Sequence, residues 1–401
     1  MKKHSIQVAV LNLVLTLLTG MTNCGNAQTD SSVALVNGLL IDGIGSKPIE
    51  HSIVIIRDGK IADVGIVGQL SIPSNTKIVE LNGASVLPGF INAHVHDAFS
   101  PDNLATWASN GVTSVRDMAI HIKSIDEIIK TLSLRSDELN KSNYARLFSA
   151  GPIITVPGGY GGYVEITSPE NAVNTVKKLI QGGVDAIKIS LEDGFAGEHD
   201  LPKLTPEEIS AIVQTAHSFG KRVTLHVTQA KYLEQGIDLG VDEIAHVPYD
   251  TIPLPVILNM VEKNIFLVPT FTVFRNYGAP IKTCIENLHN FVKAGGHVLL
   301  GNDFDGGIGT FETGIPMYEI ECMQQAGMTP MDIIVSATKN GAYACGQAGN
   351  IGTIEVGKSA DILIVNGNPL NDIHALSKIQ LVIKNGVVIA DHNHECLIRG
   401  K

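Results

Sequence analysis

The sequence predicts an α/β protein in which a (β/α)₈ barrel of the TIM type is joined to a small β-sandwich domain. Over residues 87–350, strand-like apolar runs alternate with helix-like segments eight times, which is the pattern of such a barrel. Residues 33–86 and 351–395 contain short β runs separated by turns. Two β regions that flank an α/β middle favour one β-sandwich domain built from both ends of the chain.

The N-terminal segment, residues 1–27, has the features of a secretory signal peptide. A lysine pair precedes the mostly apolar stretch 6–21, which is too short to span a bilayer comfortably. Gly25 and Ala27 supply the small residues of a signal-peptidase site. The alternative is a lipoprotein signal in which Cys24 is lipidated. Both interpretations predict export, so that the mature protein is secreted or periplasmic.

Composition allows a large core and argues against polyanionic partners. The chain has 401 residues, is 44% hydrophobic and carries a formal net charge of −11. Without residues 1–27, which hold two lysines and no acid, 27 basic residues stand against 40 acidic ones, a net charge of −13. An acidic surface disfavours nucleic acid and anionic membranes. We therefore expect a small-molecule substrate and no membrane span, and a homo-oligomer is left open.

Export to an oxidising compartment permits disulfides, but the remaining cysteines show no close-spaced framework. Their pairing is left open for Cys284, Cys322, Cys345 and Cys396.

Turn and cap signals place several elements. Asp58-Gly59 and Asn385-Gly386 lie between apolar runs and predict hairpin turns in the β domain. Thr205-Pro-Glu-Glu208 is a capping box with proline at the first helical position, so it predicts the start of a barrel helix. The eight barrel strands are predicted to end near His96, Asp117, Ala150, Lys188, His226, His246, Thr270 and Asp303.

The most informative motif is a pair of histidines, His94 and His96, after an apolar run. In a β-strand this spacing puts both imidazoles on one face, where they can share a divalent metal ion. Such a pair is weak evidence alone, because most are incidental. Further polar residues in apolar runs strengthen it in order along the chain: Lys188, His226, His246 and Asp303. Taken singly, each of these residues is better interpreted as a core histidine, a turn residue or a snorkelling lysine. Their order at successive strand ends favours a metal centre.

Together these segments resemble the amidohydrolase superfamily, specifically its members with two metals and a carboxylated lysine, in the imidazolonepropionase-like and prolidase-like branch. The resemblance spans nearly the whole mature chain. Its matching motifs are Val86-Leu-Pro-Gly-Phe-Ile-Asn-Ala-His-Val-His, Gly111-Val-Thr-Ser-Val-Arg-Asp, Asp185-Ala-Ile-Lys-Ile, the strand histidines, Gly301-Asn-Asp303 and Gly352-Thr-Ile-Glu-Val-Gly-Lys-Ser-Ala-Asp361-Ile-Leu.

The resemblance implies a specific set of cofactors. Burial lowers the pKa of a lysine, and the neutral amine of Lys188 can add CO₂ to form a bridging carbamate. One metal ion would be bound by His94, His96, Asp303 and the carbamate, and the other by the carbamate, His226 and His246. Zn²⁺ suits these ligands, and Mn²⁺, Co²⁺ or Fe²⁺ also fit. A metal-bridging hydroxide would attack the substrate while Asp303 transfers the proton to the leaving group.

Substrate contacts are expected from loops after the strands. The segment Gly158-Gly-Tyr160-Gly-Gly-Tyr163 follows the third strand, so Tyr160 and Tyr163 are candidate substrate-binding residues. Relatives often carry histidine where Tyr160 stands, which puts the family's substrates in doubt for this chain. The other interpretation is a glycine turn with two surface tyrosines. Further rim candidates are His121, Tyr249, Arg275 and Asp305.

The sequence thus predicts a metal-dependent hydrolase of amide C–N bonds, such as a dipeptidase or carboxypeptidase of prolidase type. The alternative is a lactonase or organophosphate triesterase with the same binuclear site. A non-catalytic binding protein on this scaffold is disfavoured, because such proteins typically lose ligands. Imidazolonepropionase itself is disfavoured by the signal segment and by Lys188.

Overall fold

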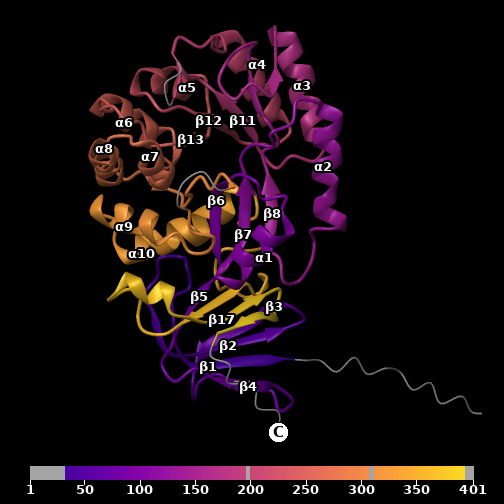
Figure 1. Ribbon diagram of the computed structural model, residues 1–401. Helices are drawn as coiled ribbons and strands as arrows, with labels where there is room; N and C mark the ends of the chain where they lie inside the picture. The colour runs from indigo at the N-terminus through magenta and orange to yellow at the C-terminus, as the bar shows by residue number, and fades with distance from the viewer. Residues whose placement is uncertain (1–31, 196–198, 307–310, 393–401) are drawn as a thin grey trace, which may run out of the picture. The chain divides into compact units, whose positions relative to one another are not determined.

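The two ends of the chain contribute strands to one eight-stranded sheet, in the order β18-β17-β16-β5-β1-β2-β3 with β4 paired to β1 (Figure 1). The computed structural model describes residues 32–195, 199–306 and 311–392. Its arrangement as a two-layer sandwich and the domain bounds stay predictions. The strands are β1 Val33–Leu40, β2 Ile49–Arg57, β3 Lys60–Ile66, β4 Lys77–Glu80, β5 Ser85–Pro88, β16 Ile362–Val365, β17 Ile379–Lys384 and β18 Val387–Asp391.

Both predicted hairpin turns in this sheet are confirmed. Asp58 and Gly59 connect β2 to β3 with φ values of 51° and 76°, and Asn385 and Gly386 connect β17 to β18 with φ values of 49° and 74°. Positive φ at both central positions matches the twist of the paired strands, and asparagine, aspartate and glycine adopt it most readily.

The strands of the predicted barrel form two parallel sheets. One has the order β6-β7-β8 and the other the order β10-β9-β11-β12-β13-β14-β15. Their bounds are β6 Phe90–Val95, β7 Val112–Asp117, β8 Arg146–Ser149, β9 Ile153–Thr155, β10 Val164–Glu165, β11 Ile187–Ser190, β12 Val223–His226, β13 Glu243–Ala245, β14 Phe266–Val268 and β15 His297–Val298.

The chain beyond β15 runs beside β6. Ala93 N–H donates to Leu300 O at 2.8 Å and Asp303 N–H donates to His94 O at 2.9 Å, while Val95 and Phe304 form a parallel bridge. These bonds bring residues 300–304 to the strand that carries the histidine pair. Closure of the two sheets into one continuous barrel stays a prediction.

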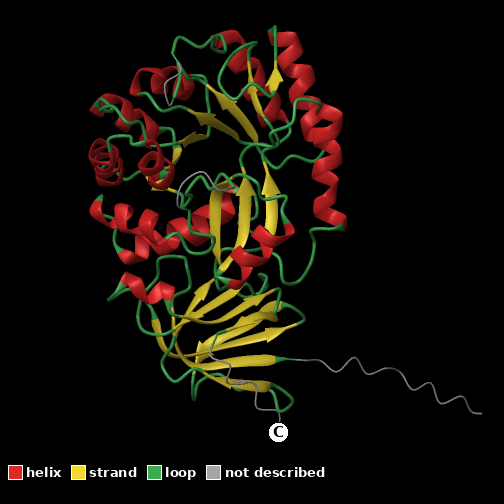
Figure 2. Cartoon of the chain, viewed as in Figure 1, coloured by secondary structure: helices red, strands yellow, loops and turns green. Residues whose placement is uncertain are grey.

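Helices follow most of these strands, as Figure 2 shows. The capping box at Thr205 and Glu208 is confirmed at the start of α4, and proline occupies an early position there. The helices are α1 Pro101–Ser109, α2 Ile125–Asp137, α3 Pro169–Gln181, α4 Pro206–Ser218, α5 Leu233–Asp238, α6 Leu254–Glu262, α7 Phe271–Tyr277, α8 Ile281–Lys293, α9 Met317–Gln325, α10 Pro330–Val335 and α11 Gly341–Ala344, with shorter helical turns at Ala230–Tyr232, Ser336–Asn340 and Ile373–Ser377.

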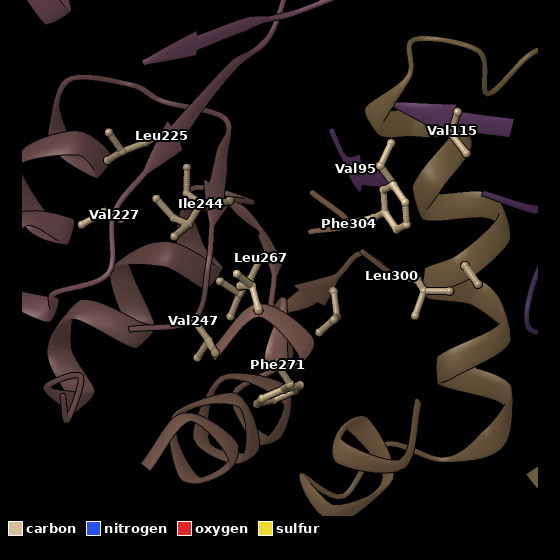
Figure 3. Close-up of a cluster of buried hydrophobic side chains, with 14 of the residues drawn as sticks. Val95, Val115, Leu225, Val227, Ile244, Val247, Leu267, Phe271, Leu300 and Phe304 are labelled. Atoms are coloured by element: carbon tan, nitrogen blue, oxygen red, sulfur yellow. The ribbon is translucent and has the colours of Figure 1, made fainter. Parts of the chain in front are cut away.

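A large apolar core lies between strands and helices. Val95 of β6, Leu225 of β12 and Ile244 of β13 are fully buried in it (Figure 3). Three cysteines, Cys284, Cys322 and Cys345, are buried and free, and burial raises the pKa of each thiol to about 12. No helix within the described ranges has both the length and the apolar character needed to cross a membrane. The predicted signal segment, Cys24 and Cys396 lie outside the described residues.

Candidate functional site

The six side chains predicted to bind metal come together near the carboxyl ends of the parallel strands. They are His94 on β6, His96 directly after it, Lys188 on β11, His226 at the end of β12, His246 directly after β13 and Asp303 in the segment after β15. His96 is partly exposed, and the other five are buried. Residues distant in sequence meet here because parallel strands present their carboxyl ends on one side.

Strand alternation decides which side chains reach the site. Leu225 of β12 packs against α5, where a Cβ added to Gly236 would lie 2.3 Å from Leu225 Cδ2. His226, the next residue, therefore points to the opposite side of the strand. The glycine thus allows α5 to lie close to β12 while the histidine faces the site.

His94, His96 and Asp303 form the tightest part of the cluster. Asp303 Oδ1 lies 3.3 Å from His94 Nε2 and 2.9 Å from His96 Nε2. One ligand atom from each of the three residues lies within 4.8 Å of the others. Gly301 permits this approach, because a Cβ there would lie 2.8 Å from His94 Cβ. The geometry is that of three ligands to one ion.

The other three candidates adjoin this group. Lys188 Nζ lies 3.2 Å from His94 Nε2, and His226 Nδ1 lies 2.8 Å from His246 Nε2. His246 Nδ1 is 3.7 Å from Asp303 Oδ2, which connects the second histidine pair to the first. The structure thus brings all six predicted residues into one continuous cluster.

Three residues of the site have a backbone conformation that side chains other than glycine seldom adopt. The φ values are 78° at His246, 55° at Thr270 and 54° at Asp303. For the β-branched Thr270 this conformation is especially unfavourable. Such strain persists only where surrounding structure enforces it, and it concentrates at functional sites.

Burial controls the charge of the cluster. Burial, followed by the positive charge of Lys188 for two of them, lowers the pKa of His94 and His226 well below the usual value, and burial with His226 does so for His246. Burial also lowers the pKa of Lys188 to about 7. The three imidazoles are therefore neutral at pH 7, the form that coordinates metal, and an unprotonated lysine is accessible near neutral pH.

A divalent metal ion fits these residues. Within the described part of the chain, three buried atoms of the cluster lack a hydrogen-bond partner: His94 Nδ1, His226 Nε2 and Asp303 Oδ1. Leaving buried polar atoms without partners is costly, and neutral imidazole with carboxylate is a typical donor set for Zn²⁺ and similar ions.

Sequence reasoning did not assign a role to two residues that support His246. Thr270 Oγ1 lies 2.8 Å from His246 Nδ1. Glu319 of α9 is buried and accepts hydrogen bonds from the backbone N–H groups of Phe271 and Thr272, at 2.9 and 3.0 Å. Glu319 thereby fixes the start of α7, directly after Thr270. Thr270 was predicted only as a strand end, and a lone acid on a distant helix gives no local signal.

Glu192, four residues after Lys188, was also missed. Its Oε2 accepts hydrogen bonds from Thr228 N–H at 3.0 Å and Thr228 Oγ1 at 2.6 Å, and lies 3.7 Å from His226 Nε2. It therefore ties the segment after β11 to the segment after β12, beside the second histidine pair.

A cavity of about 830 Å³ opens over the cluster. His121, Tyr160, Tyr163 and Asp305, all predicted rim residues, line it. Tyr160 stacks on His226 with ring centroids 4.2 Å apart. The glycine-rich loop is therefore more than a surface turn.

Two predicted substrate-binding residues are placed elsewhere. The Arg275 guanidinium lies over the Tyr318 ring, 3.9 Å from its centroid, and Tyr249 packs against the hydrophobic core. Neither is among the described residues that line the cavity. Arg275 lies within α7 and Tyr249 follows β13, and the direction of each side chain depends on packing that the sequence does not show.

Comparison with known proteins gives concordant results. The amidohydrolase family model matches residues 85–389. An imidazolonepropionase from Clostridium tetani is 25% identical over 395 residues, covering 85% of this chain and 91% of that protein. An ochratoxinase from Aspergillus niger is 25% identical over 421 residues, covering 89% and 86%. A crystal structure of a Xaa-Pro dipeptidase with bound methionine has 24% identity and a TM-score of 0.76, covering 89% and 99%. These neighbours imply a TIM-like barrel.

Proposed function

The chain belongs to the amidohydrolase family, in its imidazolonepropionase-like and prolidase-like branch, and from that membership we propose that it hydrolyses amide bonds at a centre of two divalent metal ions. The observation that carries the proposal is the cluster of four histidines, Lys188 and Asp303, in which three buried atoms accept or donate no hydrogen bond and three buried imidazoles are neutral, as metal coordination requires.

The residues would divide between two ions. His94, His96 and Asp303 would hold one ion, and His226 and His246 the other, with a CO₂-derived carbamate on Lys188 between them. When bound, such ions act as Lewis acids and lower the pKa of water to near neutral. Zn²⁺ is the first candidate, followed by Mn²⁺, Co²⁺ and Fe²⁺.

The chain's own groups supply the remaining chemistry. Asp303 lines the cavity and its Oδ1 accepts no hydrogen bond, so it can take a proton from the attacking water and give it to the departing amine. Its backbone N–H donates to His94 O at 2.9 Å, which holds the carboxylate in this position. The cavity walls orient the substrate and limit the access of bulk water.

One narrower function rests on likeness, and one alternative function rests on the shared metal centre. A dipeptidase of prolidase type agrees with the fold shared with the Xaa-Pro dipeptidase, and the ochratoxinase is a second relative of similar identity. A lactonase or organophosphate triesterase would use the same centre. Export by residues 1–27, as a secreted, periplasmic or Cys24-anchored protein, also remains part of the proposal.

Metal analysis with a matched pair of lysine variants tests the binuclear centre. Lys188 and Lys384 are both buried, but Lys384 lies in β17, where Nζ donates to Lys141 O at 3.2 Å. The wild type reconstituted with Zn²⁺, Mn²⁺ or Co²⁺ is expected to hold about two ions per chain and to cleave amides. Lys188→Met is expected to lose both properties, whereas Lys384→Met keeps them in the folded fraction.

Two results contradict the proposal. One is a metal content near zero after reconstitution of the wild type. The other is full amide turnover in Lys188→Met, which would exclude the carbamate. Turnover of a panel of dipeptides, N-acyl amines, lactones and aryl phosphotriesters identifies which type of bond is cleaved. Turnover of lactones or phosphotriesters alone would replace the amidase function by that of a lactonase or triesterase.

A further inference from the structure

The imidazole of His226 is contacted on its face as well as on its edge. The Tyr160 ring stacks on it with centroids 4.2 Å apart and planes inclined by 16°. On the edge, His226 Nδ1 lies 2.8 Å from His246 Nε2, and His226 Nε2 lies 3.7 Å from the carboxylate of Glu192. The torsion that turns an imidazole about its Cβ–Cγ bond is soft. A parallel ring against one face therefore restricts the direction in which both nitrogens of His226 point.

The backbone of Tyr160 is fixed to the strand beside this histidine. Ser190 Oγ donates a hydrogen bond to Tyr160 O at 2.9 Å. Ser190 ends β11 and is paired with His226, the last residue of β12, in the register of these parallel strands. The loop is thus anchored beside the point where the histidine leaves its strand, and the position of the Tyr160 ring is set relative to His226.

Gly159 allows the loop to lie this close to the neighbouring segments. A Cβ added at Gly159 would lie 2.3 Å from Thr155 Oγ1 and 2.9 Å from Pro202 O, well inside contact distance. A residue without a side chain lets the backbone approach other atoms that closely. The glycine that precedes Tyr160 is therefore needed to place this ring against His226.

The second tyrosine of the loop offers an internal comparison. Tyr163 stacks on His121 with centroids 4.8 Å apart, and His121 stacks on His96 at 5.4 Å. Tyr163 thus reaches a candidate ligand through a second ring, whereas Tyr160 stacks on one directly. Both tyrosines line the cavity. They therefore share the cavity but differ in how they reach the candidate ligands.

Resting on the proposed binuclear centre, we propose that Tyr160 is a positioning residue for the second ion, the one assigned to His226 and His246. Its ring holds the plane of the His226 imidazole before the ion binds, so less conformational freedom is lost on coordination. Outer contacts that orient a ligating imidazole typically contribute about ten- to a hundredfold to metal affinity. Removal of the ring should therefore weaken the second ion and leave the first almost unchanged.

Stepwise Zn²⁺ affinities, measured by competition with a chromogenic chelator, test this role. Tyr160→Leu is expected to lower the affinity for one of the two ions by at least about tenfold, whereas Tyr160→Phe, which keeps the ring, stays within about threefold of wild type. Tyr163→Leu removes a ring from the same loop and is the matched control, expected to stay within about threefold for both ions. Urea unfolding of the metal-free proteins should show similar losses for the two leucine variants, since each loses a stacked ring.

A second background identifies the ion concerned. His246→Ala removes a candidate ligand of the second ion and is expected to hold about one ion per chain. In that background, Tyr160→Leu should change the affinity for the remaining ion by less than about threefold. A loss of about tenfold there would mean that Tyr160 acts on the first ion, and would overturn the assignment to His226.

The other outcomes separate this inference from the proposed function. A wild type that holds about two ions per chain, with Tyr160→Leu unchanged, overturns the inference and leaves the function standing. Equal losses in Tyr160→Leu and Tyr160→Phe would assign the effect to the hydroxyl and also overturn it. Equal losses in Tyr160→Leu and Tyr163→Leu would reduce the loop to a structural support. A wild type that binds no metal ion after reconstitution contradicts the proposed function and the inference together.

Discussion

Two clusters of buried ionisable side chains lie among the parallel strands. They differ in whether their buried polar atoms make hydrogen bonds. In the first, Arg116 of β7 is fully buried and uses all three guanidinium nitrogens: Nε donates to Ala93 O at 2.8 Å, one terminal nitrogen to Ala344 O at 3.2 Å, and the other pairs with the buried carboxylate of Glu243. In the second, the candidate metal centre, three buried atoms have no partner.

The difference separates a structural network from a binding site. A buried ion pair is tolerable when each group is hydrogen-bonded, and Arg116 with Glu243 meets that condition. Unpartnered buried atoms cost free energy in the protein alone, so their persistence at His94, His226 and Asp303 points to a ligand that completes them. Similar side chains in one fold thus have different roles, and the count of satisfied atoms distinguishes them.

The difference between the two clusters can be tested by converting one carboxylate in each cluster to its amide. Asp303→Asn is expected to lower kcat of the metal-loaded enzyme by about a hundred- to ten-thousand-fold, because the proton acceptor and a ligand charge are lost. The unfolding free energy of the metal-free protein, measured in urea, should change by less than in the satisfied cluster, because Asp303 Oδ1 accepts no hydrogen bond and the nearest positive group is His96 Nε2 at 2.9 Å. Turnover close to wild type would remove Asp303 from the catalytic assignment.

The matched change in the satisfied cluster should have the opposite profile. Glu243→Gln leaves the Arg116 guanidinium buried without its counter-charge, which is expected to cost about 3 kcal/mol of unfolding free energy. Urea unfolding measures this loss, and kcat per folded molecule should change less than tenfold. Unchanged stability with a collapse of kcat would instead assign the Arg116–Glu243 pair to the functional site.

Most strand ends could be predicted from the sequence because apolar runs and polar terminators are local signals. The prediction was correct for Asp117 and His226, which end β7 and β12, and it was within two residues for β6, β8, β11, β13 and β14. It was less accurate at Asp303, which follows the short β15 by five residues. There the chain leaves β15 to pair with β6, a contact that depends on the other sheet.

The residues that support the site were beyond sequence reasoning because their function depends on contacts distant along the chain. Glu319 is 47 residues or more from the N–H groups it accepts from. Arg275 was predicted at the rim, yet it stacks on Tyr318 of α9, a neighbour set by helix packing. The residue types at strand ends predict which chemistry a set of ligands can support. The orientation of those side chains is determined by the tertiary structure.

The prediction with the smallest expected effect concerns the hydroxyl next to His246. It tests whether the orientation of this imidazole affects metal affinity. Thr270→Val keeps the shape and the strained backbone of the β-branched residue but removes Oγ1, which lies 2.8 Å from His246 Nδ1. Partners of this kind fix the orientation of a metal-binding imidazole, and their loss typically costs about ten- to a hundredfold in metal affinity. We expect a fall in that range for the more weakly held ion, measured by competition with a chromogenic chelator.

Thr272→Val is the matched control, because Thr272 belongs to the same helix start but its hydroxyl donates to Glu319 at 3.0 Å, whereas the hydroxyl beside His246 is that of Thr270. It should change stability modestly and leave metal affinity within about threefold of wild type. Equal losses of affinity in both variants would show that the start of α7 acts only as a structural support. A loss confined to Thr270→Val would establish that the strained threonine is kept for the histidine it orients, and would extend the contrast between satisfied and unsatisfied clusters to the residues that hold the ligands in place.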